Sequence, residues 1–306
     1  MRDMLNIAPD IQSALAADTG VVALETSVVA QGLPWPHNME AFRRCEAAVR
    51  SCHAVPATIA IQGGRARVGM TEAETMALAA GHPAKLSCSD LGCAVGLLQD
   101  GATTVSGTVA IAALAGIRVM ATGGIGGVHR GAEDTFDVSA DLDELARQPV
   151  AVVCCGAKAI LDLPKTLERL ESLGVPVVGY RTDVFPAFYH KDSGLRLLWH
   201  ADDPMALARI LTAHWDGMRR ISGVLIVQAP PRDLDATKVD LAVSRALAES
   251  VADGVTGKAV TPFLLGRVAA LTDGESIDVN LALLEENARL AGLVAVALAS
   301  ARKERS

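Results

Sequence analysis

Residues that can do chemistry gather between Ala121 and Lys158. This segment begins with the glycine-rich run TGGIGG, continues through His129 and an acidic cluster around Asp137, and ends at a lysine in an apolar run. Backbone amides of a glycine turn can bind an anion, a carboxylate can hold a hard divalent metal ion, and an amine can attack a carbon atom. The combination indicates an active site, because few segments of an ordinary core need all three at once.

The glycine run matches neither common nucleotide-binding motif. Gly124 and Gly126 fit the first two glycines of GxGxxG, but His129 stands where a third small residue is needed, and there is no GxxxxGK[ST] motif. Two interpretations stay open, a tight strand-to-helix turn and a set of amides that bind phosphate or carboxylate. His129 is either a solvated loop residue or a substrate contact that is charged beside an acid or a phosphate.

Asp137, Ser139 and Asp141 stand at alternate positions in DVSAD. In an extended segment their side chains would all point the same way. Asp137 could then hold a hard divalent ion while the other two face a bound ligand. A second, compatible interpretation makes Asp141 and Glu144 a capping box for the helix LDELA.

Lys158 and Glu25 each come at the end of an apolar run that predicts a buried strand. Ligands of α/β proteins bind at the carboxyl ends of strands, and a poorly hydrated lysine there keeps more free amine for nucleophilic attack. Glu25 would be either a structural hydrogen-bond acceptor or a proton donor. Lys158 could instead extend from a helix start into solvent. Lys85, just before SCSD, is either a phosphate contact or a surface lysine.

Apolar runs that alternate with helical patterns predict the elements that position these residues. Thr71 and Glu74 predict a capping box at the start of one helix. The predicted strands are 21–25, 57–64, 66–70, 117–122, 151–155, 175–180 and 223–228, and the predicted helices are 9–17, 38–52, 71–80, 107–116, 160–174, 235–251, 258–271 and 278–300. Residues 190–204 suggest an excursion from the sheet. The pattern predicts one α/β domain over residues 1–306, with a sheet covered on both faces.

The composition restricts the class of protein. Half of the 306 residues are hydrophobic but only 3% are aromatic, which predicts a core of small aliphatic side chains. The net charge of −7 argues against broad nucleic-acid binding. Six cysteines without a CxxC pair favour a reduced, cytoplasmic protein. The N-terminus has no apolar signal core, and Val105–Gly127 is interrupted by Arg118 and glycines, so we expect no membrane span.

Seven motifs together resemble the pseudouridine-5′-phosphate glycosidase family over about residues 15–300. In chain order they are ALETSVVAQGLPWPHN, PATIAIQGG, GATTVSGT, ATGGIGGVHRG, DVSADLDEL, GAKAILDLPKTLE and GYRTDVFPAFY. The resemblance implies a three-layer α/β/α fold with a mixed, mainly parallel sheet, a homotrimer and a divalent metal ion, typically Mn²⁺. It also implies reversible cleavage of the C–C glycosidic bond of pseudouridine 5′-phosphate to uracil and ribose 5-phosphate.

Site residues follow from the resemblance position by position. Glu25 matches the proton donor, Lys158 the covalent nucleophile and Asp137 the metal ligand. The positions that match substrate contacts are Lys85, Val105, Thr122, His129, Ser139, Ala140, Asp141 and Asn280. Lys85 and Thr122 are expected near the phosphate. Asn280 is expected to read the base, and Asn287 is the alternative.

The implied chemistry differs from that of ordinary glycosidases, because a C–C glycoside has no leaving oxygen or nitrogen to protonate. Glu25 would protonate the ring oxygen while the Lys158 amine adds at C1′. A lysine–ribose imine would then hold the sugar until water releases it.

The sequence departs from the family pattern at two places. Cys88 and Ser89 stand where the family commonly has two basic residues, and Gln31 stands where it commonly has histidine. These changes leave the identity of the group attached to the sugar open. One alternative is a C-glycosynthase that attaches ribose 5-phosphate to an aromatic carbon in pigment or antibiotic biosynthesis. Another is a sugar-phosphate-binding protein without turnover.

Overall fold

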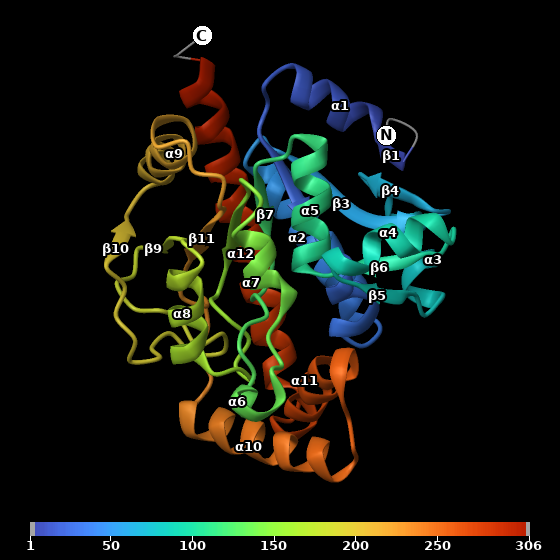
Figure 1. Cartoon of the computed structure of the whole chain (residues 1–306), viewed down its shortest axis with the longest axis vertical. Coiled ribbons are helices and arrows are strands. Elements are labelled where there is room, and N and C mark those ends of the chain that lie inside the picture. The colour runs from blue at the N-terminus through green and yellow to red at the C-terminus, as the bar shows by residue number, and fades with distance from the viewer. Residues whose placement is uncertain (1–3, 304–306) are drawn as a thin grey trace.

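A computed structural model describes residues 4–303. In this part of the chain eleven strands join into one sheet, shown with its flanking helices in Figure 1. The strands are β1 (Leu5–Ile7), β2 (Val21–Leu24), β3 (Val55–Gln62), β4 (Arg65–Val68), β5 (Ala84–Leu86), β6 (Gly101–Thr103), β7 (Val119–Ala121), β8 (Ala151–Cys154), β9 (Val177–Tyr180), β10 (Trp199–Ala201) and β11 (Val224–Val227).

The sheet is mixed and mainly parallel. Its strand order is β1-β4-β3-β2-β7-β8-β11-β9-β10, and the pairs from β3 to β10 along this path are all parallel. The first half of β3 pairs with β2, and its second half pairs antiparallel with β4 and β6. β5 joins the sheet through β6. The central strands are apolar throughout because helices cover both of their faces.

Helices form the outer two layers of a three-layer α/β/α fold, as predicted. They are α1 (Pro9–Ala16), α2 (His37–Ser51), α3 (Glu72–Ala80), α4 (Leu91–Gly96), α5 (Val105–Ala115), α6 (Ala132–Thr135), α7 (Ala140–Leu145), α8 (Leu163–Ser172), α9 (Pro204–Thr212), α10 (Ala236–Ala252), α11 (Val260–Leu271) and α12 (Glu275–Lys303). The long α12 packs on β2, β7 and β8 and against α2 and α9. In Figure 1 it runs behind the sheet, and α5 and α7 lie in front.

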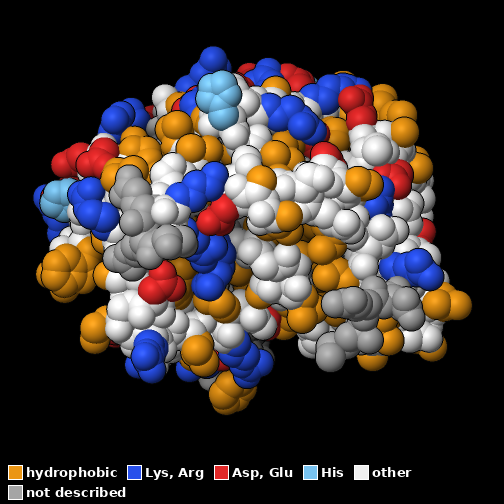
Figure 2. All heavy atoms as spheres, turned by 90° about the horizontal axis from the view of Figure 1, so that it is seen from above, with side chains coloured by type: hydrophobic (Ala, Val, Ile, Leu, Met, Phe, Trp, Pro, Cys, Tyr) orange, Lys and Arg blue, Asp and Glu red, His pale blue; other side chains and the backbone are white. Residues whose placement is uncertain are grey.

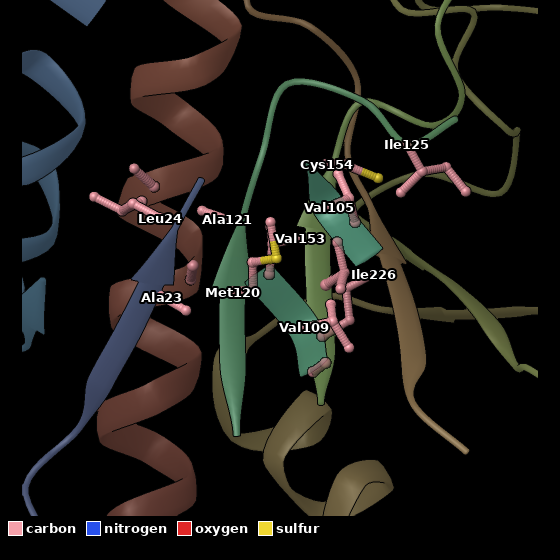
Figure 3. Packing of buried hydrophobic residues seen from close by; sticks show 14 of the residues in the cluster. Ala23, Leu24, Val105, Val109, Met120, Ala121, Ile125, Val153, Cys154 and Ile226 are labelled. Atoms are coloured by element: carbon pink, nitrogen blue, oxygen red, sulfur yellow. The ribbon is translucent and has the colours of Figure 1, made fainter. Parts of the chain in front are cut away.

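The core is built from small aliphatic side chains. Figure 3 shows Val105 and Val109 of α5 packed with Met120, Val153 and Ile226 from three neighbouring strands, and all five are at most 1% exposed. Burial of each such side chain contributes roughly 1.5–3 kcal/mol. The close packing of α5 on the strands fixes the helix start, which borders the site described below.

Most predicted elements are confirmed to within a few residues, but one prediction was wrong. Trp199–Ala201, inside the supposed excursion, forms the edge strand β10 parallel to β9. The chain returns to the sheet after an irregular segment, and three residues are too few to show a strand pattern. The same shortness explains why β1, β5 and β6 were not predicted.

The apolar segment at Val105–Gly127 divides into α5, β7 and the glycine run. Within residues 4–303, no helix combines the length and the apolar character that a membrane crossing requires. On the face seen in Figure 2, Lys and Arg side chains stand beside Asp and Glu side chains, among hydrophobic ones.

The capping box predicted at Thr71 is present. The Thr71 hydroxyl accepts from the Glu74 amide at 3.2 Å, and the Glu74 carboxylate accepts from the Thr71 amide at 2.7 Å. We expect Thr71→Ala to lower the free energy of unfolding by about 1 kcal/mol, because the Glu74 amide in the first turn of α3 loses the side-chain oxygen to which it donates. Urea unfolding measures the effect, and Thr71→Ser should retain wild-type stability. Equal stability of the alanine variant would contradict this role.

Candidate active site

The register of three parallel strands brings the candidate residues to one edge of the sheet. Leu24 of β2 pairs with Ala121 of β7, so the residues that follow them, Glu25 and Thr122, emerge side by side. Lys158 lies four residues beyond the end of β8, which is the other neighbour of β7. Ligands bind at such carboxyl edges because the chain leaves the sheet there in loops.

A cavity of about 320 Å³ opens at this edge. Its lining includes every site residue predicted from the sequence: Glu25, Lys85, Val105, Thr122, His129, Asp137, Ser139, Ala140, Asp141, Lys158 and Asn280. These residues come from positions 25 to 280 of the chain, and the fold brings all of them together. Their individual chemical roles stay predictions.

The glycine run packs closely against other segments, which explains its composition. A Cβ atom at Gly126 would lie 2.2 Å from the Ser139 hydroxyl oxygen, and one at Gly124 would lie 2.6 Å from the Phe188 ring. The run does not turn directly into a helix. It continues beyond β7, and Ile125 forms a parallel bridge with Ala157, just before Lys158. The glycines therefore allow close approach, and they fix the backbone next to Lys158.

The amides of this region do bind a carboxylate, but it belongs to the protein. The two carboxylate oxygens of Asp141 accept from the amides of Ser106 and Gly126, each at 2.8 Å. Asp141 is only 5% exposed. It therefore joins the start of α5 to the glycine run and forms one wall of the cavity.

The expected capping box at Asp141 and Glu144 was wrong. Ser139 is the N-cap of α7, and its hydroxyl accepts from the Asp141 amide at 3.2 Å. Glu144 instead accepts from the Gln148 side chain. Since the helix begins at Ala140, the predicted alternation of side chains ends at Ser139.

Glu25 is buried and held by two hydroxyl groups. Thr122 donates to Oε1 of its carboxylate and Ser27 donates to Oε2. Thr122 thus contacts Glu25 directly, although the resemblance placed it near the phosphate. A carboxyl group held in this way is oriented to give a proton to a ligand in the cavity when it carries one.

Three lysines line the cavity, together with the three acidic side chains of Glu25, Asp137 and Asp141. Lys158 and Lys85 are half-buried, and Lys258 comes from the segment before α11. Burial lowers the pKa of Lys85, and the positive charge of Lys158 lowers it further. An anion bound between these lysines would relieve their mutual repulsion.

His129 and Asp137 form a pair on the cavity wall, with 3.7 Å between Nδ1 and Oδ2. Asp137 favours the charged imidazole, but burial has the larger effect, and the pKa of His129 lies below its usual value. Burial therefore favours the neutral imidazole, and the charging of His129 by a bound phosphate stays a prediction. Neutral imidazole can both donate and accept a hydrogen bond to a ligand.

The donor set around Asp137 fits one kind of metal site. Among the described residues, no group of three or more His, Cys, Asp or Glu side chains is arranged to hold a metal ion. The Asp137 side chain is 42% exposed and borders the cavity. A single carboxylate with water and substrate oxygens is a common environment for Mg²⁺ or Mn²⁺, whereas a site made wholly of protein ligands would need more donors.

Asn280 and Asn287, both on α12, have different surroundings. Asn280 lines the cavity, as the base-reading prediction requires. Asn287 is fully buried and donates to the carbonyl oxygens of Thr122 and Gly123, at 2.8 and 3.3 Å. The structure therefore does not support Asn287 as the alternative base contact, because its amide is engaged by the backbone.

Lys258 is a cavity residue that the sequence analysis missed. Its ammonium group donates to Asp90 at 2.5 Å and to the carbonyl oxygen of Lys85 at 3.3 Å. Thr261 and Leu265 of α11 also line the cavity, so this helix forms part of the cavity wall. The available signal was a lysine at the start of a predicted helix, where the helix dipole disfavours a cation.

A sequence profile of the family described as "Indigoidine synthase A like protein" matches residues 10–297. The chain belongs to this family. A relative named pseudouridine-5′-phosphate glycosidase, from Herpetosiphon aurantiacus, is 53% identical over 299 residues, covering 96% of this chain and 98% of the relative. A protein of the same name from Methylobacterium nodulans is 50% identical over 302 residues, covering 98% and 89%.

Two solved structures have the same fold as this chain. The crystal structure of the prealnumycin C-glycosynthase AlnA in complex with ribulose 5-phosphate superposes with a TM-score of 0.91 at 39% identity and covers 99% of both chains. An indigoidine synthase A (IdgA)-like protein from Thermotoga maritima gives a TM-score of 0.88 at 33% identity, covering 97% of both chains. The family resemblance inferred from the sequence motifs is confirmed.

The close packing at Gly126 gives a direct test of the cavity wall. We expect Gly126→Ala to lower the free energy of unfolding by about 1–3 kcal/mol, because the new methyl group meets Ser139 and displaces Asp141. Gly92→Ala in α4 is the matched control, since a Cβ atom there has no neighbour within 4 Å. Urea unfolding compares the two variants, and equal stability would refute the close approach.

Proposed function

We propose that this protein reversibly cleaves the C–C glycosidic bond of pseudouridine 5′-phosphate with water, giving uracil and ribose 5-phosphate. One observation carries the proposal: Glu25 and Lys158 reach the same cavity from two strand ends, in a chain 53% identical to a glycosidase of that name. A carboxyl group and an amine on one cavity supply a proton donor and a nucleophile, which this bond requires.

The proposed reaction begins with proton transfer from Glu25 to the ring oxygen of the ribose. The sugar ring opens, and the Lys158 amine adds at C1′. The uracil carbon then takes up a proton as its bond to C1′ breaks, and the electrons of that bond stay with the uracil. The remaining lysine–ribose imine is hydrolysed by water, which returns the free amine and releases ribose 5-phosphate.

The phosphate end of the substrate is assigned to the lysine-rich part of the cavity. Lys85 and Lys258 supply charge, and Ser87 and Ser106 supply hydroxyl groups on the same lining. Remote binding of the phosphate would orient the reacting carbon and so contribute to the rate. Asp137 would hold Mn²⁺ or another divalent ion, which when bound would neutralise phosphate charge.

Incubation with pseudouridine 5′-phosphate and Mn²⁺ tests the proposal by release of free uracil. We expect Lys158→Ala to reduce uracil release below detection while the unfolding transition stays close to that of the wild type, because the nucleophile is lost and the other cavity lysines, Lys85 and Lys258, are assigned to the phosphate. Lys191→Ala, whose side chain pairs with Asp233 outside the cavity lining, should retain full activity. Substantial turnover by the Lys158 variant would refute the imine mechanism.

A second candidate function is C-glycosynthase activity, which joins ribose 5-phosphate to an aromatic carbon. The likeness to the prealnumycin C-glycosynthase over 99% of both chains favours it. Cys88 and Ser89 also leave this chain without a basic pair near Lys85. Absence of uracil release, combined with ribose 5-phosphate trapped on Lys158 by borohydride, would support the synthase over the glycosidase.

Lys258 is proposed to replace the cations that Cys88 and Ser89 do not supply. We expect Lys258→Ala to raise KM for pseudouridine 5′-phosphate roughly tenfold, the size of one lost charged hydrogen bond, with little change in kcat. Unphosphorylated pseudouridine should be turned over equally by variant and wild type. The control Asp90→Asn removes the ion-pair partner but keeps Lys258, and should raise KM less than Lys258→Ala does. An equal rise in KM for pseudouridine 5′-phosphate and for pseudouridine would contradict phosphate recognition by Lys258.

The homotrimer and the cytoplasmic location that the resemblance and composition suggested are further proposals. Light scattering of the purified protein gives the number of chains, and a mass three times 31.8 kDa is expected.

A further inference from the structure

A buried polar network lies behind Glu25. Asn287 donates to the carbonyl oxygens of Thr122 and Gly123, and its own carbonyl oxygen accepts from Gln228 at 2.9 Å and from the Cys155 thiol at 3.5 Å. Burial raises the pKa of Cys155, so this group stays a thiol and can donate. One amide on α12 therefore joins the residues that follow β7, β8 and β11.

Thr122 connects this network to the cavity. Its amide donates to Val153 of β8 at 3.0 Å, its carbonyl oxygen accepts from Asn287, and its hydroxyl donates to Glu25. The residue is 3% exposed. With both backbone groups fixed, the Thr122 hydroxyl can hold the carboxyl group in one orientation.

Ser27, two residues further along the chain, donates to the second oxygen of the same carboxyl group. It starts the π-helical turn Val28–Gly32 and lines the cavity. The intervening Thr26 is anchored by its hydroxyl, which donates to Ile59 of β3 at 2.8 Å. Glu25 is therefore fixed from β7 on one side and from its own loop on the other.

We propose that Thr122 and Ser27 are positioning residues that clamp Glu25 for proton transfer, with Asn287 as the buried anchor of Thr122. The inference deepens the proposed function, because it rests on Glu25 as the proton donor. The clamp holds the carboxyl group toward the sugar. Each hydroxyl fixes one oxygen, so loss of either lets the group rotate away from the ring oxygen.

The test is a double-mutant cycle between Thr122→Val and Glu25→Gln. Threonine and valine have the same shape, so Thr122→Val removes only the hydroxyl. The rate measured is that of ribose 5-phosphate attachment to Lys158, trapped with borohydride. We expect Thr122→Val to slow it roughly ten- to hundredfold, the range for a lost hydrogen bond to the negative charge that develops on Glu25 as its proton leaves. Calorimetric binding of ribose 5-phosphate should be unchanged.

Two comparisons separate positioning from a general loss of structure. Thr122→Ser should restore most of the rate, and Thr122→Val should have little further effect in a Glu25→Gln background, because the partner is already lost. Ser27→Ala should behave like Thr122→Val. Additive effects in the cycle, or a Thr122→Val rate equal to the wild type, would overturn the clamp.

The same cycle measured by urea unfolding needs no activity. Coupling between Thr122 and Glu25 in the free energy of unfolding is expected whether or not uracil is released. If the wild type forms no adduct with ribose 5-phosphate, the proposed function fails, and coupling in unfolding then shows whether the hydroxyls hold Glu25. Additive effects of the two substitutions on the free energy of unfolding would likewise refute the clamp.

Discussion

The parallel register of β2, β7 and β8 is the constraint on which the site depends. Because Leu24 pairs with Ala121, and Ala121 in turn with Val153, the chain leaves all three strands at one level. A carboxyl group, a hydroxyl and the segment that carries the amine then share one edge. A shift of one residue in this pairing would turn each side chain to the other face of the sheet and separate the groups.

Two buried polar side chains hold the backbone in place where it leaves the strands and the hydrogen bonds of the sheet end. Asn287 binds backbone after β7, and Asp141 binds backbone in the glycine run and at the start of α5. Strand ends need such partners because an unpaired buried backbone group costs about 1–3 kcal/mol. The residues that bind these backbone groups therefore also give the cavity a rigid wall. Precise orientation of a bound sugar requires such rigidity.

The fold and many of the residues that line the site could be predicted from the sequence, but the hydrogen bonds among these residues could not. Apolar runs marked the central strands, and long motifs marked the family. The roles of Asp141 and Asn287 could not be predicted, since their partners lie 15 to 165 residues away in the chain. Lys258 was missed for the same reason, as Asp90 is 168 residues from it. Side-chain type and local spacing say little about a hydrogen bond between distant segments.

The ion pair of Lys258 with Asp90 has a consequence for ligand binding. It connects the first turn before α11 to the loop after β5, and the Lys258 side chain is 56% exposed. Exposed ion pairs contribute only about 0–1 kcal/mol and weaken as ionic strength rises. The Lys258–Asp90 contact on the cavity wall is thus weaker than the buried hydrogen bonds of Glu25 and Asp141. A rise in ionic strength would therefore loosen Lys258, which is proposed to hold the phosphate, before it affects the orientation of Glu25 and Asp141.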